Sequence, residues 1–297
     1  CSLATRSGVM LTGSHNPAEY NGLKIVIGGK TLAEKGIQEL YDRVSHDRFH
    51  QGQGQIHEVN VIENYITRVS SDVKLKRPLK IVVDAGNGVA AAVAPQLFRK
   101  MGCDVHELYC EIDGRFPNHH PDPSQTENLQ DLIRTMRETG ADIGLAFDGD
   151  ADRLGVVTTS GEVIWPDRQL MVFAKEILER EPAAKIIYDV KCTYHLARVI
   201  DEAGGEPIMW KTGHSLVKAK LAETQAALAG EMSGHIFFKD RWYGFDDAVY
   251  SGARLLEILA KTLAHLLPSL GRQPTKKTIP KLLAPQQQIN RQYHRNQ

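Results

Sequence analysis

Nucleophilic and basic side chains gather in one short stretch near the start of the sequence. Ser14 and His15 stand in the run Thr-Gly-Ser-His-Asn-Pro at residues 12–17, and Lys24 follows shortly after. Glycine beside an Asn-Pro pair predicts a tight, exposed turn. A serine hydroxyl there can accept a phosphoryl group, and an imidazole or amine beside it can transfer the proton. Taken alone, the run is also typical of a simple turn.

A second stretch carries three carboxylates in the run Asp-Gly-Asp-Ala-Asp-Arg at residues 148–153, after an apolar segment. The alternate positions of Asp148, Asp150 and Asp152 can direct oxygens at one hard cation, and Mg²⁺ prefers such ligands. Three solvated turn aspartates are the weaker interpretation, because packing like charges without a cation is costly. An EF-hand is excluded, since its glycine and glutamate positions hold Arg and Thr. A phosphatase of the haloacid-dehalogenase type stays open, because such enzymes place Asp-x-Asp after a strand.

A third stretch suits the recognition of sugar hydroxyls. The run Gly-Glu-Met-Ser-Gly-His at residues 230–235 puts the carboxylate of Glu231, the hydroxyl of Ser233 and the imidazole of His235 on one loop. A strand-end turn with incidental polar residues is an equal alternative at this point. His214 lies in a similar run at residues 211–215 and could face a phosphate or a sugar, while the serine of that run could simply cap a helix.

Three further runs resemble known binding motifs only weakly. Residues 28–31, Gly-Gly-Lys-Thr, fail as a P-loop because the required first glycine falls on Lys24. Residues 86–91 follow a predicted strand and open a predicted helix, so a dinucleotide site there stays open. Residues 118–122, with two adjacent histidines, are more typical of a structural loop.

The elements that position these residues alternate between apolar strands and amphipathic helices, which predicts three consecutive α/β domains with mixed, mostly parallel sheets. We expect domains at residues 1–59, 60–162 and 163–270, followed by a tail at 271–297. The strands expected are 8–12, 23–27, 79–84, 103–109, 142–147, 154–158, 185–190, 206–210 and 227–230. The helices expected are 33–47, 89–101, 126–138, 167–179, 194–203, 215–224 and 248–267.

Composition excludes several partners. The 297 residues have a formal net charge of zero, so no global field attracts nucleic acid or an anionic membrane. The sequence contains no run of eighteen apolar residues, so it predicts no membrane-spanning helix. The four scattered cysteines predict a reduced, cytoplasmic protein. The tail has six basic residues and no acidic one, so we expect it to be disordered or a non-native ending.

The three runs, taken in their order, resemble the α-D-phosphohexomutase superfamily, and the surrounding sequence is most similar to its bacterial phosphomannomutase/phosphoglucomutase branch. The resemblance extends from about residue 4 to about residue 267. It implies an enzyme that interconverts the 1-phosphate and 6-phosphate of glucose or mannose through a hexose 1,6-bisphosphate. It also implies that the turn at residues 84–88 is part of the framework, which disfavours the dinucleotide site.

The resemblance implies a role for each residue. Ser14 is expected to be a phosphoserine whose phosphate also touches one Mg²⁺ held by Asp148, Asp150 and Asp152. The remaining expected roles are phosphoserine support by Arg153, proton transfer by His15 and Lys24, hydroxyl recognition by Glu231 and Ser233, and cleft lining by Lys191, His214 and His235. Glu231 is expected to bind O3 and O4, so that both hexoses fit.

The sequence also departs from the superfamily pattern. Superfamily members have more chain before the serine and a fourth domain with a phosphate-binding loop. We therefore expect the first domain to be incomplete, the fourth to be absent, and turnover by this chain to be weak. A catalytically dead remnant that binds Mg²⁺ and sugar phosphate is the alternative. The expected partners are hexose phosphates, without nucleic acid or membrane, and a monomer is favoured.

Overall fold

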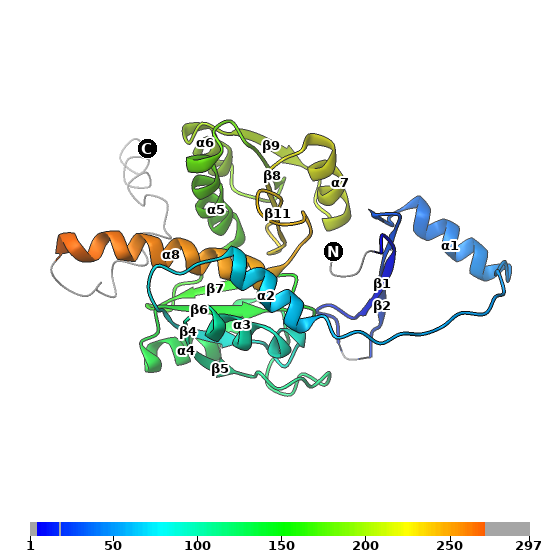
Figure 1. Cartoon of the computed structure of the whole chain (residues 1–297), viewed down its shortest axis with the longest axis horizontal. Coiled ribbons are helices and arrows are strands. Elements are labelled where there is room, and N and C mark those ends of the chain that lie inside the picture. Colours follow the sequence, from blue (N-terminus) through cyan, green and yellow to red (C-terminus); the bar gives the residue numbers. More distant parts are fainter. Residues whose placement is uncertain (1–4, 18, 271–297) are drawn as a thin grey trace, which may run out of the picture.

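Three α/β regions follow one another along the chain in the computed structural model, which describes residues 5–17 and 19–270 and, in the last helix, side chains only as far as residue 262 (Figure 1). The tail expected at 271–297 lies outside the described residues. The first region holds β1 (Gly8–Thr12), β2 (Gly22–Ile27), β3 (Lys30–Thr31) and α1 (Lys35–Ser45). It projects from the rest of the molecule, and an extended stretch leads from α1 back to α2 (Figure 1).

The sheet of this first region is antiparallel throughout its described residues, with order β1-β2-β3, and so differs from the mostly parallel arrangement expected. The reason is the short connection at residues 13–21, which joins β1 to β2 as a hairpin, whereas parallel strands need a long crossover. Apolar side chains of β1 stay exposed: Val9 is 64% and Leu11 69% accessible.

The second region has the mixed, mostly parallel sheet that was expected, in the order β5-β4-β6-β7. Only β7 runs antiparallel, because residues 148–153 join it directly to β6. Every residue of β6 and β7 is buried, as is usual where helices cover both faces of a sheet. The elements are α2 (Ile62–Asp72), β4 (Lys80–Asp84), η1 (Val89–Ala92), α3 (Ala94–Lys100), β5 (Asp104–Leu108), η2 (Thr126–Leu129), α4 (Gln130–Thr139), β6 (Ile143–Phe147) and β7 (Leu154–Thr158).

The third region repeats this plan with the order β11-β10-β8-β9, in which only β11 is antiparallel. Residues 231–235 make the direct connection between β10 and β11. The elements are α5 (Pro166–Arg180), β8 (Lys185–Asp189), α6 (His195–Glu202), β9 (Glu206–Trp210), α7 (His214–Thr224), β10 (Leu228–Gly230), β11 (Ile236–Phe238) and α8 (Ala248–Leu270).

Helix α8 packs the second and third regions together. Its buried residues share one hydrophobic core with Phe98 and Leu145 of the second region and with Phe173 and Phe238 of the third. Arg254 of α8 is fully buried and donates to Glu176 and Asp240, which both belong to the third region, at 2.8–3.1 Å. The two regions are therefore held together by apolar packing around α8 and by Arg241, whose Nη2 donates to Asp72 of α2 at 3.0 Å.

Several elements were not expected. Helix α2 was missed although Ile62, Ile66, Val69 and Val73 follow helical spacing, and the short strands β3 and β11 were missed as well. The helix expected at 89–101 is divided into η1 and α3, and that expected at 126–138 into η2 and α4.

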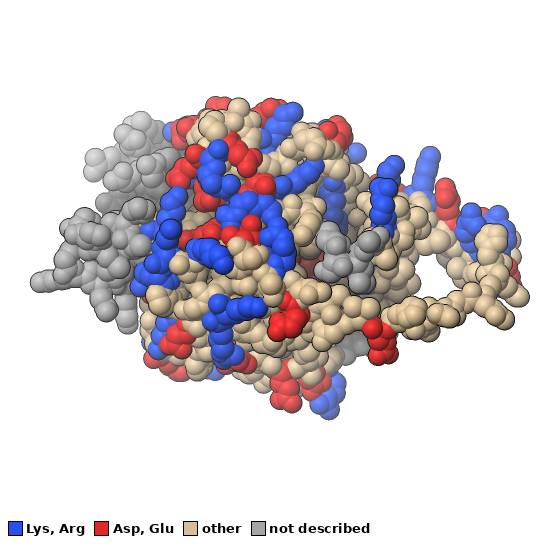
Figure 2. Space-filling model, in the orientation of Figure 1, with Lys and Arg blue, Asp and Glu red and all other residues tan. Residues whose placement is uncertain are grey.

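The molecular surface carries both signs of charge. On the face in Figure 2, acidic and basic side chains are interspersed, in keeping with a net charge of zero. Among the described residues, Cys103, Cys110 and Cys192 form no disulfide. None of the described helices combines the length and apolar character needed to cross a bilayer.

Candidate active site

Each of the three chemistry-bearing runs connects a pair of antiparallel strands, and the three connections meet. Thr12 Oγ1 donates to Asp150 Oδ2 at 2.9 Å, which joins the serine turn to the aspartate loop. Leu154 N donates to Gly234 O at 3.3 Å, and Arg153 forms an antiparallel bridge with His235, which join the aspartate loop to the third run. Residues more than a hundred positions apart thus form one site.

Ser14 occupies a strained position at this junction. Its φ is +52°, in the left-handed region that serine rarely adopts, and its backbone N–H donates to Thr12 Oγ1 at 2.7 Å. Ser14 Oγ lies 3.2 Å from His15 Nδ1. A Cβ atom at residue 149 would lie 2.2 Å from the carbonyl oxygen of Ser14, so only Gly149 lets the two loops pack this closely. Burial, and then the charge of Arg153, lower the pKa of His15.

The three aspartates come together as expected. Carboxylate oxygens of Asp148, Asp150 and Asp152 all lie within 4.8 Å of one another, and the residues are buried. Asp148 accepts the backbone N–H groups of Asp152 and Arg153, each at 3.0 Å, and Arg153 Nε at 2.8 Å. Burial raises the pKa of Asp148 to about 7, and the nearby charge of Asp152 adds to this effect.

Lys24 places a cation between two of these carboxylates. Its Nζ donates to Asp150 Oδ2 at 2.7 Å and to Asp152 Oδ2 at 2.5 Å. Although burial opposes its charge, these carboxylates raise the pKa of Lys24. The second oxygens, Asp150 Oδ1 and Asp152 Oδ1, are buried and have no hydrogen-bond partner among the described residues. Two orphaned carboxylate oxygens beside a protein cation fit a site for a metal ion.

The turn opened by Gly86 supports the aspartate loop. Val89 N donates to Gly149 O at 3.1 Å, and a Cβ atom at Gly88 would lie 2.8 Å from that same oxygen. The aspartate loop thus fills the space over the turn that a dinucleotide would need. His119, from the loop at 118–122, lies 3.1 Å from Asp84 and also belongs to this framework.

The third run is partly committed to structure. Glu231 is buried, its Oε1 accepts Gly213 N–H at 2.5 Å, and burial raises its pKa. One acceptor site of Glu231 is therefore used by the backbone, and its expected binding of O3 and O4 stays a prediction. Ser233 is half-buried on the same loop, and Lys191 is exposed just beyond β8.

Several residues of this site were not found by sequence reasoning. Asp189, fully buried at the end of β8, accepts from Met232 N at 3.2 Å, Thr212 Oγ1 at 2.9 Å and Cys192 Sγ at 3.1 Å. The sequence did contain an indication of Asp189, because this aspartate stands at the end of an apolar strand, just as Asp148 stands directly after β6.

A further ionic cluster surrounds His235. Its Nδ1 lies 3.2 Å from Asp246 Oδ2 and 3.4 Å from Asp152 Oδ1, and Lys218 Nζ lies 2.9 Å from Asp246 Oδ1. His214 Nδ1 is 3.7 Å from Asp246 Oδ2. Asp152, His235 and Asp246 are close enough to share a cation, and Lys218 already supplies positive charge beside Asp246. Burial, and then the charge of Lys218, lower the pKa of His214. Neither Asp246 nor Lys218 lies in a recognisable motif.

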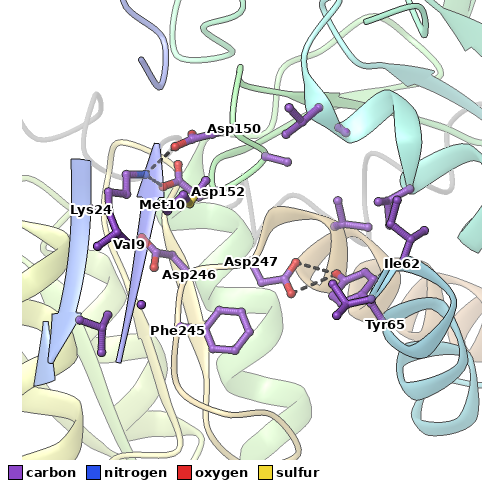
Figure 3. A pocket seen from close by; sticks show the side chains of 18 of the residues that line it. Val9, Met10, Lys24, Ile62, Tyr65, Asp150, Asp152, Phe245, Asp246 and Asp247 are labelled. Atoms are coloured by element: carbon purple, nitrogen blue, oxygen red, sulfur yellow. Dashed lines mark hydrogen bonds and ion pairs between the residues drawn. The ribbon is translucent and has the colours of Figure 1, made fainter. Parts of the chain in front are cut away.

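A cavity of about 580 Å³ adjoins these groups (Figure 3). Its wall is largely apolar, with Val9 and Met10 of β1 on one side and Ile62 of α2 and Phe245 on others. Figure 3 shows Lys24 reaching from β2 to Asp150 and Asp152, whereas Asp247 points away toward Tyr65. Ser14 and Glu231 do not line the cavity.

Comparison with known proteins identifies similar sequences over nearly the whole chain. Three family models described as phosphoglucomutase/phosphomannomutase, alpha/beta/alpha domains I, II and III, match residues 2–51, 61–161 and 165–275.

Individual proteins agree with these models. A phosphomannomutase/phosphoglucomutase of Pseudomonas putida is 59% identical over 260 residues, and a phosphoglucomutase of Neisseria gonorrhoeae is 58% identical over 256. These alignments cover 88% and 86% of this chain, but 56% of each relative. A crystal structure of a phosphoglucomutase/phosphomannomutase family protein from Burkholderia thailandensis has a TM-score of 0.85 at 59% identity, over 91% of this chain and 58% of that one. The chain thus spans little more than half the length of these relatives.

Proposed function

Because the chain belongs to the phosphoglucomutase/phosphomannomutase family of α-D-phosphohexomutases, we propose that it interconverts the 1-phosphate and 6-phosphate of glucose or mannose. The observation that carries the proposal is the contact of the Ser14 turn with the aspartate loop through Thr12 and Lys24. It brings a hydroxyl that can carry phosphate beside a set of carboxylates that can hold a cation.

In this proposal Ser14 carries the phosphoryl group. The sugar oxygen forms a bond to phosphorus as the bond from phosphorus to Ser14 Oγ breaks, and the proton of the sugar hydroxyl is transferred to the released Oγ. The resulting hexose 1,6-bisphosphate turns and returns its other phosphoryl group to Ser14. Phosphate is conserved and no oxidant or reductant is needed. His15 lies 3.2 Å from Ser14 Oγ and is the nearest group to move the proton, with Lys24 as the second.

Asp148, Asp150 and Asp152 would hold one Mg²⁺, as supported by the orphaned oxygens of Asp150 and Asp152. When bound, the ion offsets negative charge on the transferring phosphoryl group. Arg153 donates to Asp148 and, at 3.3 Å, to Asp122. These two bonds hold the aspartate loop in place. Arg153 Nη2 is buried without a partner among the described residues and can receive a phosphate oxygen.

The remaining residues would recognise the sugar phosphate. Glu231 and Ser233 are the proposed hydroxyl ligands, and Lys191, His214 and His235 are proposed to line the cleft. Domain boundaries at 59/60 and 162/163, a cytoplasmic location and a monomeric state remain predictions from the sequence.

The haloacid-dehalogenase alternative is disfavoured by the surroundings of Asp148. That chemistry needs the first aspartate as nucleophile, but Asp148 is fully buried and both of its oxygens accept hydrogen bonds from Arg153 or the backbone. A protein that binds sugar phosphate without turnover remains the second candidate.

The test is conversion of glucose 1-phosphate in the presence of Mg²⁺ and catalytic glucose 1,6-bisphosphate, with binding measured by calorimetry. Turnover by this chain is expected to be weak, and Ser14→Ala is expected to abolish it while binding persists. Ser71→Ala, on an exposed face of α2, is the matched control and is expected to behave as wild type. Binding without turnover in the wild type would favour the second candidate, and turnover that survives Ser14→Ala would contradict the role of Ser14.

A further inference from the structure

Asp246 is the centre of a cationic cluster that none of the motifs predicts. Its Oδ1 accepts from Lys218 Nζ at 2.9 Å, and its Oδ2 lies 3.2 Å from His235 Nδ1 and 3.7 Å from His214 Nδ1. The Asp246 side chain is only 7% exposed. Three basic side chains, two from α7 and one from the loop before β11, therefore converge on one buried carboxylate.

The carboxylate remains ionised in this setting. Burial alone would favour its neutral form, but hydrogen bonds and charge from His235 and Lys218 lower the pKa of Asp246. A buried anion of this kind is tolerated only when it is paired.

The backbone at Asp246 is fixed on both sides. Asp246 forms an antiparallel bridge with Phe237 of β11, and the next residue, Asp247, caps α8 by accepting Tyr250 N–H at 2.8 Å. Asp247 also accepts the hydroxyl of Tyr65 at 2.9 Å. The two neighbouring carboxylates point in opposite directions, Asp246 toward the aspartate loop and Asp247 toward α2 (Figure 3).

This arrangement determines the orientation of the His235 ring. Nδ1 lies between Asp246 Oδ2 at 3.2 Å and Asp152 Oδ1 at 3.4 Å, and the ring stacks on His214 with centroids 5.8 Å apart. Neither contact has hydrogen-bond geometry among the described residues, so the two carboxylates act on the ring as ion-pair partners, which favour one rotation of the imidazole and a proton on Nδ1.

We infer that Asp246 is a positioning residue: it holds His235 and Lys218 in one geometry, and so keeps the third run aligned with the aspartate loop. The inference rests on the proposed function for its consequence on sugar-phosphate binding, but the geometry of the ring can be measured without substrate. Asp246 itself touches no reacting group in this account.

The experiment compares wild type with Asp246→Asn, which keeps the size of the side chain and removes its charge. The matched control is Asp247→Asn, because asparagine also caps helices well and Asp247 does not contact His235. Two quantities are measured: the NMR signal of the His235 ring Nδ1–H proton, assigned by its loss in His235→Gln, and the dissociation constant of glucose 1-phosphate.

Asp246→Asn is expected to shift or remove the ring proton signal and to weaken glucose 1-phosphate binding about ten- to a hundredfold. Asp246→Glu is expected to recover part of both effects, while Asp247→Asn changes neither. An unchanged ring signal, or a changed signal with unchanged binding, would overturn the inference. If wild type fails to bind glucose 1-phosphate, the proposed function fails, and the ring signal still decides whether Asp246 positions His235.

Discussion

Lys24 occupies the space between the carboxylates that we assign to the metal. Its ammonium nitrogen lies 2.7 Å from Asp150 Oδ2 and 2.5 Å from Asp152 Oδ2. At these distances no metal ion can lie between the ammonium group and either carboxylate oxygen. Lys24 therefore competes with a metal ion for the same oxygens, as well as being available for proton transfer.

Lys24→Met is expected to tighten Mn²⁺ binding about tenfold, because it removes a positive charge within contact distance of the ligands. The measurement is a titration of Mn²⁺ followed by electron paramagnetic resonance. Lys30→Met, at an exposed position in β3, serves as the control. Weaker or unchanged Mn²⁺ binding in Lys24→Met would show that Lys24 does not compete.

Asp247 makes stability depend on pH. Burial raises the pKa of Asp247 to about 6, with Asp246 adding to the effect and the bonds from Tyr250 N–H and Tyr65 opposing it. Because the folded pKa lies above the ordinary aspartate value, the folded state binds more protons between pH 4 and 6. Stability from this group is thus fully present below about pH 4 and lost as pH rises through 6.

Asp247→Asn is expected to remove this dependence. A shift of about two pKa units corresponds to at most about 3 kcal/mol, so the free energy of unfolding of the mutant relative to wild type should rise by up to that amount from pH 4 to pH 7. Urea unfolding at both pH values measures it. A constant difference across this range would mean that Asp247 titrates normally.

At the scale of elements, the three functional runs were predictable because each follows an apolar strand and contains its own turn residues. Their common structure was not predicted: each links antiparallel strands, β1 to β2, β6 to β7 and β10 to β11. Strand β11 has only three residues, too few to give a period-two pattern, and α2 was missed because a polar, extended stretch precedes it.

Asp189 links three loops of the third region through Met232 N, Thr212 Oγ1 and Cys192 Sγ. Asp189→Asn leaves one of these groups without an acceptor, which should cost about 1–3 kcal/mol in stability. It should also increase amide hydrogen exchange in residues 211–214 and 231–235, measured by mass spectrometry. Asp201→Asn, exposed on α6, should leave exchange in both segments unchanged. Equal exchange in the two variants would contradict this role of Asp189.

At the scale of the whole molecule, sequence reasoning could identify each group of site residues but not how they meet. The contact of Lys24 with Asp150 spans 126 positions, and that of Thr12 with Asp150 spans 138. No local pattern encodes such a contact, because it depends on how whole sheets pack. For the same reason Asp246 was missed, since its importance comes only from partners on other elements.

Arg254 joins α8 to α5 and to the loop after β11 within the third region. Arg254→Met leaves Glu176 and Asp240 partly uncompensated in the interior and is expected to cost about 3–5 kcal/mol. Lys261→Met, at an exposed position on the same helix, should change stability by less than about 1 kcal/mol. Urea unfolding of the two variants tests this, and similar values for both would show that the buried network does not stabilise the fold.

The central claim, that Ser14 carries the phosphoryl group, is tested most directly by locating the phosphate. The purified protein is incubated with Mg²⁺ and glucose 1,6-bisphosphate labelled with ³²P, and the labelled peptide is sequenced by mass spectrometry. We predict that the label is on Ser14 and is absent from Ser14→Ala. Label on Asp148 or any other residue, or label that persists in Ser14→Ala, would contradict the account.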